Sequence, residues 1–350
     1  MSELVMKSEL PSGPIKIGIV GATGAVGIEI VPVLHKRKFP VESISLYASG
    51  RSAGKISSTL FGDIVIEEFS VEKARSCHVV FLAVSGDFAL QYAKLLVEGD
   101  GPVVIDNSSA FRYMDDVPLI IPEVNASAIG SSKLIANPNC TTAIASVVLW
   151  PIHCQYRIKK LIVSTYQAAS GAGAEGMEEL KTGTEIKLQN PSLSPPHSVF
   201  VHPLPFNIIP HIDKFQSNAY TKEEMKVVWE TRKIFGLTEE DIKISCTAVR
   251  IPTFRAHAEA ISIETEGPVT AEAVRELLSH TPGVRLVDDP VNNLYPMPLT
   301  ATSEFDVEVG RIRESLVFQP NGLELFVAGD QLLRGAALNA VLIAEKMIPA

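Results

Sequence analysis

Cysteine is scarce in this sequence, and the spacing of the few cysteines excludes two kinds of protein. Only four occur in 350 residues, namely Cys77, Cys140, Cys154 and Cys246. They form neither the paired spacing of a zinc site nor the dense framework of a small disulfide-rich secreted domain. We therefore expect no metal site, no disulfide bond and a reducing, cytoplasmic environment.

Long runs of basic residues and long apolar runs are also missing. The net charge is −9, from 31 Lys and Arg against 40 Asp and Glu, so we expect neither nucleic acid nor a membrane surface as a partner. No apolar stretch reaches the roughly 18 residues of a membrane span. Residues 1–14 lack the apolar core of a signal peptide, and their acidic residues argue against a transit peptide.

The remaining composition is that of a soluble globular chain long enough for two domains, with 46% hydrophobic and 20% charged residues. Strand and helix patterns alternate in its first part. We expect strands at 15–20, 41–47, 79–84 and 103–106, and helices at 28–35 and 88–97. Such alternation predicts an α/β fold with a doubly wound parallel sheet, whose ligands bind beyond the carboxyl ends of the strands.

A glycine-rich turn joins the first expected strand to the first expected helix. It reads GATGAVG, so its spacing is G-x-x-G-x-x-G rather than G-x-G-x-x-G. Between a strand and a helix, such a turn lets backbone approach a pyrophosphate, and the helix N-terminus supplies N–H donors. The turn therefore predicts a dinucleotide site built from Gly21, Thr23, Gly24, Ala25, Val26 and Gly27.

The segment after the second expected strand bears on the choice of cofactor. An NAD-preferring protein places an acidic residue near this point for the ribose 2′-hydroxyl. This chain places Ser49, Arg51, Ser52 and Lys55 there instead. Cations and hydroxyls suit a 2′-phosphate, which favours NADP(H). The alternative interpretation is a solvated basic loop.

Cys140 lies where a turn meets a helix. Pro138 biases Asn137 away from helix, and the apolar segment from Thr141 onward predicts a helix. A cysteine at a helix N-terminus is favoured as thiolate, and the free N–H groups can receive an oxyanion. The alternative is a small buried apolar cysteine. Ser85 and the loop 107–112 follow other strands and are expected near the same edge of the sheet.

The second half has a different pattern, richer in strands. Strands are expected at 159–165, 242–251, 257–265, 284–287, 306–312 and 323–328, and helices at 174–188, 220–234, 270–279 and 332–347. Thr221 with Glu224 three residues later is a capping pair for the second of these helices. The Pro-rich stretch 191–210 is expected on the surface or at a subunit contact.

Five separated segments resemble one family. They read GATGAVG at 21–27, ANPNCTT at 136–142, YQAASG at 166–171, RIPTFRAH at 250–257 and GDQLLRGAALN at 329–339. By these motifs the chain is similar to aspartate-semialdehyde dehydrogenases. The resemblance implies an N-terminal Rossmann-type domain at 1–140, a C-terminal α+β catalytic and dimerisation domain at 141–328, and a final segment, 329–350, whose helix packs back on the first domain.

The resemblance also implies an activity. The family converts L-4-aspartyl phosphate into L-aspartate 4-semialdehyde with NADPH, in the biosynthesis of lysine, threonine, methionine and diaminopimelate. The expected binding partners are therefore small molecules, and the expected assembly is a homodimer, sometimes a tetramer.

Three catalytic roles follow from the resemblance. Cys140 would attack the acyl phosphate and carry a thioester, His257 would be the general acid/base, and Gln167 would orient the carbonyl group. His257 stands seven positions after Arg250. One regular strand would place these two on opposite faces, so a bend near Pro252 is required.

Substrate and cofactor contacts are implied in the same way. Arg250 would hold the α-carboxylate, Glu224 the ammonium group, and Arg112 and Lys226 the phosphate. On an ideal helix Glu224 and Lys226 point about 200° apart, so the helix must be irregular or each must reach a different edge. The nicotinamide side of the cofactor would be lined by Ser170, Gly171 and Gln331.

Other readings stay open at this point. N-acetyl-glutamyl-phosphate reductases share the chemistry, but they tend to carry Asn-Pro-Gly-Cys, and an acetylated amine would not need Glu224. Glyceraldehyde-phosphate dehydrogenases share Cys-Thr-Thr but prefer NAD. A non-catalytic NADP-binding paralogue would be expected to lose Cys140, His257, Arg112 or Arg250, all of which are present.

Overall fold

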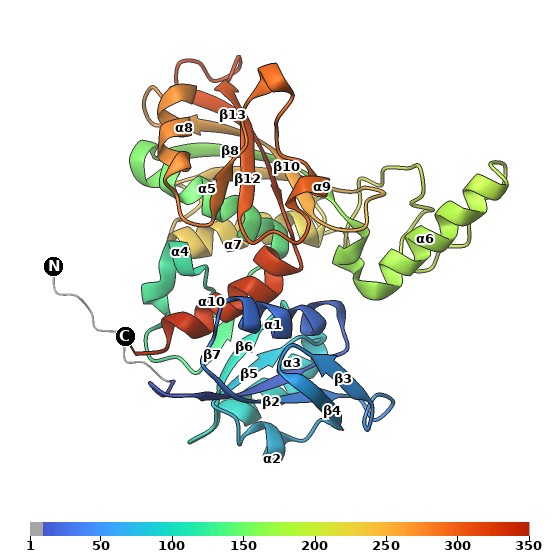
Figure 1. Ribbon diagram of the computed structural model, residues 1–350. Coiled ribbons are helices and arrows are strands. Elements are labelled where there is room, and N and C mark those ends of the chain that lie inside the picture. Colours follow the sequence, from blue (N-terminus) through green and yellow to red (C-terminus); the bar gives the residue numbers. More distant parts are fainter. Residues whose placement is uncertain (1–9, 350) are drawn as a thin grey trace. The chain divides into compact units, whose positions relative to one another are not determined.

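The computed structural model describes residues 10–349 (Figure 1). Most of the segment 1–14, in which we expect no leader peptide, lies outside the described residues. The chain forms two compact units. The first unit runs to Asn139 and resumes at Ala336, and the second unit spans Cys140–Gly335.

The first unit is built on a seven-stranded sheet of order β3-β4-β2-β1-β5-β6-β7. All neighbours pair in parallel except β3 and β4, which form an antiparallel edge hairpin. The strands are β1 (Ile15–Val20), β2 (Val41–Ala48), β3 (Ile56–Thr59), β4 (Gly62–Glu68), β5 (Val79–Leu82), β6 (Val103–Asp106) and β7 (Leu134–Ala136).

The central strands are apolar because both faces of the sheet are covered. All residues of β5 and β6 are buried, as are all but one of β1. The helices of this unit are α1 (Ala25–Lys36), α2 (Val71–Ala74), α3 (Gly86–Val97), α4 (Pro122–Asn125), the 3₁₀ turn η1 (Ala126–Ile129) and α10 (Leu338–Lys346). The predicted doubly wound parallel sheet is confirmed, while the hairpin β3–β4 was not expected.

The last helix, α10, packs back on the first unit, as predicted. It contacts α1, α4 and β6. Arg37 at the end of α1 donates from Nε and Nη2 to Glu345, at 2.9 and 2.6 Å. The buried Asn339 donates to the carbonyl oxygen of Ile120 at 2.9 Å and to Asn137 Oδ1 at 2.6 Å. The end of the chain is therefore fixed by buried polar contacts as well as by packing.

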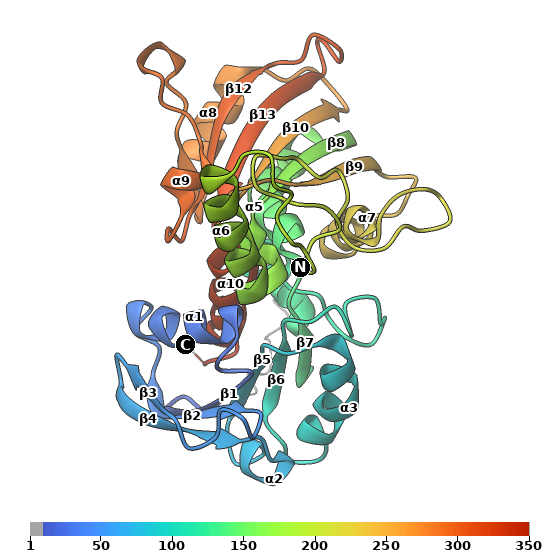
Figure 2. The same ribbon diagram turned by 90° about the vertical axis from the view of Figure 1, so that its right-hand side faces the viewer.

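The second unit contains a six-stranded mixed sheet of order β11-β12-β13-β10-β8-β9. Figure 2 shows β12, β13, β10, β8 and β9 side by side in that order. The strands are β8 (Ile158–Gln167), β9 (Lys243–Arg250), β10 (His257–Thr265), β11 (Val284–Leu286), β12 (Val307–Glu314) and β13 (Gly322–Gly329). This arrangement confirms the predicted α+β character of the C-terminal part.

Helix α5 (Cys140–Tyr156) is buried between the sheet and other helices of the second unit. It packs on β8, β10, β12 and β13, and on α7 (Lys222–Phe235) and α8 (Ala271–Ser279). Its residues are therefore apolar or small almost all around. The remaining elements are η2 (Ala169–Ala172), α6 (Gly173–Gln189), η3 (Pro290–Asn292), α9 (Pro298–Ala301) and the π-helical turn η4 (Leu333–Ala337).

The Pro-rich stretch packs on α6, which extends away from the sheet (Figure 1). Leu180 of α6 joins Phe200, Leu204 and Ile209 in one buried cluster. Phe206 in the same stretch is 69% exposed. The expected surface position is thus confirmed, and a role at a subunit contact stays a prediction.

Two properties of the described residues bear on function. No helix among residues 10–349 is long and apolar enough to cross a membrane. Within the same range, no group of three or more His, Cys, Asp and Glu side chains is arranged to hold a metal ion.

Glu259 on β10 makes the stability of the second unit depend on pH. It is wholly buried, and neither carboxylate oxygen has a hydrogen-bond partner among the described residues. Burial raises its pKa well above the usual value of 4.5, so the folded chain keeps the proton that the unfolded chain releases. Stability is therefore greatest below the unfolded pKa and falls as pH rises toward the folded pKa.

We predict that Glu259→Gln flattens this dependence. The wild type should lose up to about 1.4 kcal/mol per pH unit through this one group, and the variant should lack that contribution. Urea unfolding at pH 6 and pH 8 measures it. Glu266→Gln, at an exposed position just beyond β10, is the matched control. An identical pH slope in wild type and Glu259→Gln would contradict the assignment.

Candidate active site

Cys140 is the first residue of α5, one position earlier than the predicted helix start. The positive end of the helix dipole at this N-terminus favours negative charge at the sulfur. Its side chain is half-buried. The position therefore fits the predicted nucleophile and is unlike that of the buried Cys246 on β9.

Gly335 of the π-helical turn η4 packs directly on Cys140. A Cβ atom added at Gly335 would lie 2.4 Å from Cys140 Cβ and 2.7 Å from its Cα. Real Cβ atoms do not approach that closely, so only glycine fits. The two residues are 195 positions apart in sequence, and this contact fixes the first turn of α5 from the side.

His257 begins β10 and is wholly buried. Its Nδ1 accepts a hydrogen bond from the backbone N–H of Ala168 at 3.0 Å. The neutral ring therefore carries its proton on Nε2, which has no partner among the described residues. Burial and the positive charge of Arg250 lower the pKa of His257 to about 3, so the imidazole is neutral.

Arg250, at the end of β9, shares this environment. It donates from Nη1 to the carbonyl oxygen of Ala168 at 2.6 Å. Burial lowers the pKa of Arg250, and the negative charges of Glu223 and Cys140 act in the opposite direction. Cys140 and Glu223 are therefore close enough to act electrostatically on this guanidinium.

The expected bend between Arg250 and His257 is confirmed. The chain leaves the sheet after Arg250 and re-enters it at His257, with β8 lying between the two strands. Both side chains thus stand at one end of the sheet, beside Gln167 at the end of β8. Gly171 permits the close packing, since an added Cβ would lie 2.8 Å from Arg250 Nη1 and 3.4 Å from His257 Nε2.

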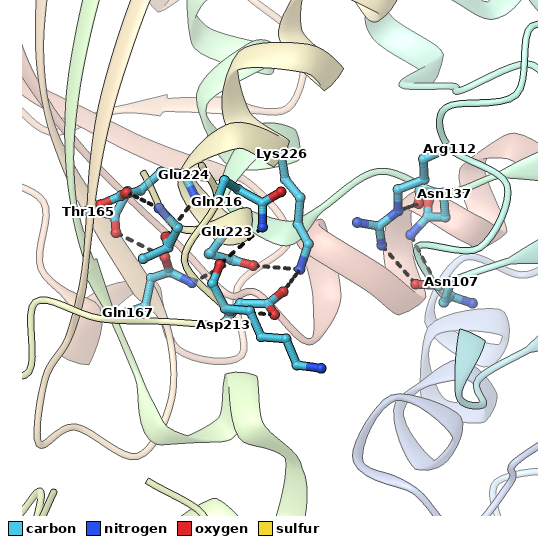
Figure 3. A network of polar contacts seen from close by, with 12 residues as sticks. Asn107, Arg112, Asn137, Thr165, Gln167, Asp213, Gln216, Glu223, Glu224 and Lys226 are labelled. Atoms are coloured by element: carbon cyan, nitrogen blue, oxygen red, sulfur yellow. Dashed lines mark hydrogen bonds and ion pairs between the residues drawn. The ribbon is translucent and has the colours of Figure 1, made fainter. Parts of the chain in front are cut away.

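Gln167 belongs to a chain of polar contacts (Figure 3). Thr165 donates to its Oε1 at 3.0 Å, and its Nε2 donates to Glu223 at 3.1 Å. Lys226 donates to Glu223 and to Asp213, both at 2.9 Å. Burial disfavours the charge on Lys226, but its contacts with Glu223 and Asp213 hold its pKa above the usual value. A charged triad thus adjoins the amide.

Glu224 has a different environment from its neighbour. It closes the predicted capping box with Thr221, accepting from the Thr221 N–H at 2.6 Å, and its other oxygen accepts from the Ala248 N–H at 3.0 Å. Both oxygens are committed to backbone, whereas Glu223 contacts Gln167 and Lys226. The sequence alone did not identify Glu223 as a site residue, although its i,i+3 spacing to Lys226 could have indicated an ion pair between the two.

Arg112 lies in the first unit and is buried. Its Nε donates to the carbonyl oxygen of Asn137 at 2.8 Å and its Nη2 to that of Asn107 at 2.9 Å (Figure 3). These loops follow β7 and β6, so the guanidinium is oriented at the carboxyl ends of parallel strands. Ser85, after β5, caps α3 by accepting from the Phe88 N–H at 3.4 Å.

The glycine-rich turn between β1 and α1 has the close packing that a pyrophosphate loop needs. Gly21 has a φ of +84°, and an added Cβ would lie 2.1 Å from the Ala83 carbonyl oxygen. At Gly27 the corresponding distance to the Gly21 oxygen is 2.2 Å. Gly24 precedes the first residue of α1 without a side-chain cap. The N–H groups of Gly21, Ala22 and Gly24 bond backbone carbonyl oxygens, so the donors that an anion could meet here are those at the start of α1.

The loop after β2 contains the basic and hydroxyl residues expected to meet a 2′-phosphate, and Arg51 is exposed there. A carboxylate also approaches this loop. Glu68 at the end of β4 places Oε1 3.2 Å from where a Cβ of Gly50 would stand. It comes from the unexpected edge hairpin, so the sequence around Ser49–Ser52 could not reveal it.

Gln331 and Ser170 are joined within the second unit. The Gln331 amide donates to the Ser170 hydroxyl, and its Oε1 accepts from the Ala256 N–H at 2.8 Å. Both side chains are buried. The two residues expected beside a nicotinamide therefore hold each other next to His257.

Comparison with known proteins gives this architecture a class. The family described as "Semialdehyde dehydrogenase, NAD binding domain" matches residues 16–132, and "Semialdehyde dehydrogenase, dimerisation domain" matches residues 149–334. The chain thus has the architecture of a semialdehyde dehydrogenase, an oxidoreductase. Its parallel sheet carries a nucleotide turn, and its second unit combines a mixed sheet that carries His257 with a helix that begins at Cys140.

Curated relatives narrow the class. Aspartate-semialdehyde dehydrogenase from Synechocystis is 43% identical over 340 residues, covering 97% of this chain and 98% of the relative. The enzyme from Aquifex aeolicus is 44% identical over 337 residues, covering 95% and 98%. The chain belongs to the aspartate-semialdehyde dehydrogenases. This membership decides against the N-acetyl-glutamyl-phosphate reductases and the glyceraldehyde-phosphate dehydrogenases, the two other families that the sequence left open.

Solved structures agree with this family. The crystal structure of aspartate semialdehyde dehydrogenase II from Vibrio cholerae, complexed with ASA, has a TM-score of 0.90 at 39% identity and covers 96% of this chain and 98% of that chain. The enzyme from Candida albicans with NADP has a TM-score of 0.73 at 27% identity, covering 95% and 98%.

We predict that Gly335→Ala disables Cys140. The added methyl must displace the first turn of α5, which should lower stability by about 1–3 kcal/mol and slow turnover by at least about 10-fold. Alkylation of Cys140 by iodoacetamide, followed by mass spectrometry, reports the sulfur directly.

The matched control is Gly267→Ala, because a Cβ there meets nothing within 4 Å. It should leave turnover and alkylation unchanged. Wild-type alkylation of Cys140 in Gly335→Ala would show that the close contact does not position the nucleophile.

Proposed function

We propose that this enzyme reduces L-4-aspartyl phosphate through a thioester on Cys140. The observation that carries the proposal is the position of Cys140 at the N-terminus of α5, electrostatically coupled to the buried Arg250. The sulfur attacks the acyl carbon, the C–O bond to phosphate breaks, and phosphate leaves with the bonding electrons. When bound, NADPH supplies the hydride that reduces the thioester.

The neutral His257 supports this chemistry as a donor. Its Nε2–H, which has no partner among the described residues, can bond the carbonyl oxygen that gains negative charge. Abstraction of a thiol proton would require the other tautomer, whose Nδ1–H would oppose the Ala168 N–H. His257 was expected to act as a general acid and base, and the geometry favours the acid role, in which Nε2–H donates its proton. The N-terminus of α5 favours the thiolate form of Cys140.

Substrate recognition is proposed from the charges beside Cys140. Arg250 keeps further N–H groups for the α-carboxylate after its single bond to Ala168. The ammonium group needs a carboxylate whose oxygens face the site. We assign it to Glu223, because Glu224 is engaged by backbone at both oxygens. Lys226 of the second unit and Arg112 of the first unit are proposed as phosphate ligands.

The first unit is proposed to bind NADP(H). The packed turn with Gly21, Thr23, Gly24, Ala25, Val26 and Gly27 supports a pyrophosphate site, and Ser49, Arg51 and Ser52 support a 2′-phosphate. The NADP in the Candida albicans structure agrees with this preference. Glu68 beside Gly50 is the feature that opposes it. Further cofactor contacts are proposed for Ser85, Ser170, Gly171 and Gln331.

The proposal extends to the assembly and the location of the enzyme. The match to a dimerisation domain supports a homodimer formed through residues of 141–328. We propose a cytoplasmic enzyme, in keeping with free thiols at all four cysteines.

The experiment that tests the proposal follows the reverse reaction. L-aspartate 4-semialdehyde, phosphate and NADP should give NADPH, and omission of phosphate should stop turnover. N-acetyl-glutamate 5-semialdehyde should be inactive, and NAD should be a poorer cofactor. Turnover that does not depend on phosphate would contradict acyl transfer to phosphate.

The same assay separates the two neighbouring glutamates. Glu223→Gln should lower kcat/KM about 10- to 100-fold, because it removes a charged contact to the substrate ammonium, and it should also lower the free energy of unfolding by about 1–3 kcal/mol, because Lys226 loses one of its two carboxylate partners. Glu224→Gln keeps an oxygen for the capping box but sets an amide NH2 against the Ala248 N–H, so it should lower the free energy of unfolding by about 1–3 kcal/mol, with kcat/KM within about threefold. The reverse pattern would restore the role to Glu224.

A further inference from the structure

Thr165 occupies a position that no catalytic step uses. It lies on β8 two residues before Gln167, so the two side chains share one face of the strand. Thr165 is wholly buried. Its hydroxyl oxygen accepts from the Val249 N–H of β9 at 3.3 Å, and its own proton is donated to Gln167 Oε1 at 3.0 Å (Figure 3).

These contacts leave one orientation for the Gln167 amide. Oε1 is bonded by Thr165, while Nε2 donates to Glu223 Oε1 at 3.1 Å. Turning the amide over would set its carbonyl oxygen against the Glu223 carboxylate, which is an acceptor only. Lys226 bonds the other oxygen of Glu223, so the carboxylate is held in its ionised form. The orientation is therefore determined from two sides.

The direction of the amide decides what Gln167 can offer a substrate. One Nε2 hydrogen is used by Glu223, and the second bonds nothing in the range 10–349 that the structure describes. An N–H aimed at a carbonyl oxygen stabilises the negative charge that forms there, whereas an amide oxygen would repel it. The Gln167 side chain would thus help or oppose the reaction, depending on which of its two amide orientations it adopts.

We propose that Thr165 is a positioning residue, which holds Gln167 so that the amide donates to the reacting carbonyl oxygen. This inference rests on the proposed function and on the role that the family resemblance implies for Gln167, which is to orient the carbonyl group, and it adds the residue that sets the direction of the Gln167 amide. Thr165 acts through Gln167 and needs no contact with substrate.

The test compares Thr165→Val with Thr165→Ser. Valine keeps the shape and removes the hydroxyl, whereas serine keeps the hydroxyl and removes a methyl group. We expect Thr165→Val to lower kcat about 10- to 100-fold with KM changed less than about threefold. Thr165→Ser should keep kcat within about threefold of wild type. Equal losses in both variants would show a packing role and overturn the proposal.

A double-mutant comparison decides whether the effect passes through Gln167. In a Gln167→Ala background, Thr165→Val should change kcat less than about twofold, because its target is gone. An undiminished effect in that background would mean that Thr165 acts on something else, and the proposal would fall.

A readout without turnover keeps this inference separate from the proposed mechanism. The Gln167 side-chain amide signal in an NMR spectrum is assigned by its loss in Gln167→Ala. Its hydrogen exchange should be at least about tenfold faster in Thr165→Val than in wild type and Thr165→Ser. Equal exchange in wild type and Thr165→Val overturns the inference, whether or not phosphate-dependent turnover is found. Absence of that turnover alone overturns only the proposed function.

Discussion

One buried backbone residue, Ala168, orients the two side chains on which the second unit's site depends. Its carbonyl oxygen accepts from Arg250, and its N–H donates to His257. Ala168 follows the last residue of β8 and is wholly buried, so a strand end fixes both partners. The neighbouring residues add further constraints, since Gly171 leaves room for the Arg250 guanidinium and the His257 ring and Gln167 carries the amide.

The electrostatic consequence is a site with one buried permanent cation and a neutral histidine. Burial lowers the pKa of Arg250, and Glu223 and Cys140 oppose that effect. The guanidinium stays charged because the ordinary pKa of arginine is so high. The same cation helps to keep a proton off His257. A carboxylate, a thiolate or an oxyanion therefore finds compensating charge and donors there without a protonated histidine. This environment suits a reaction in which negative charge moves from sulfur to oxygen.

Local patterns predicted most of the fold. Buried parallel strands, the glycine-rich turn and the cap of α7 each have a signal within about ten residues of sequence. The family motifs placed Cys140, His257, Gln167 and Arg250 together. The sheet of the second unit brings Gln167, Arg250 and His257 to one end, and the roles of the four residues stay predictions. Contacts between distant segments could not be predicted, such as Gly335 against Cys140 or Glu68 beside Gly50. The choice between Glu223 and Glu224 depends on about 100° of helix rotation, which the capping box determines only once the helix packs on β9.

The most direct test of a thioester on Cys140 is a single turnover without phosphate. The enzyme is mixed with L-aspartate 4-semialdehyde and NADP, NADPH is followed by absorbance, and the protein is then digested for mass spectrometry. The account predicts one NADPH per active site in a rapid burst, with the peptide that contains Cys140 carrying an aspartyl group in thioester linkage. NADPH formation with Cys140 unmodified, or an undiminished burst in Cys140→Ala, would contradict it.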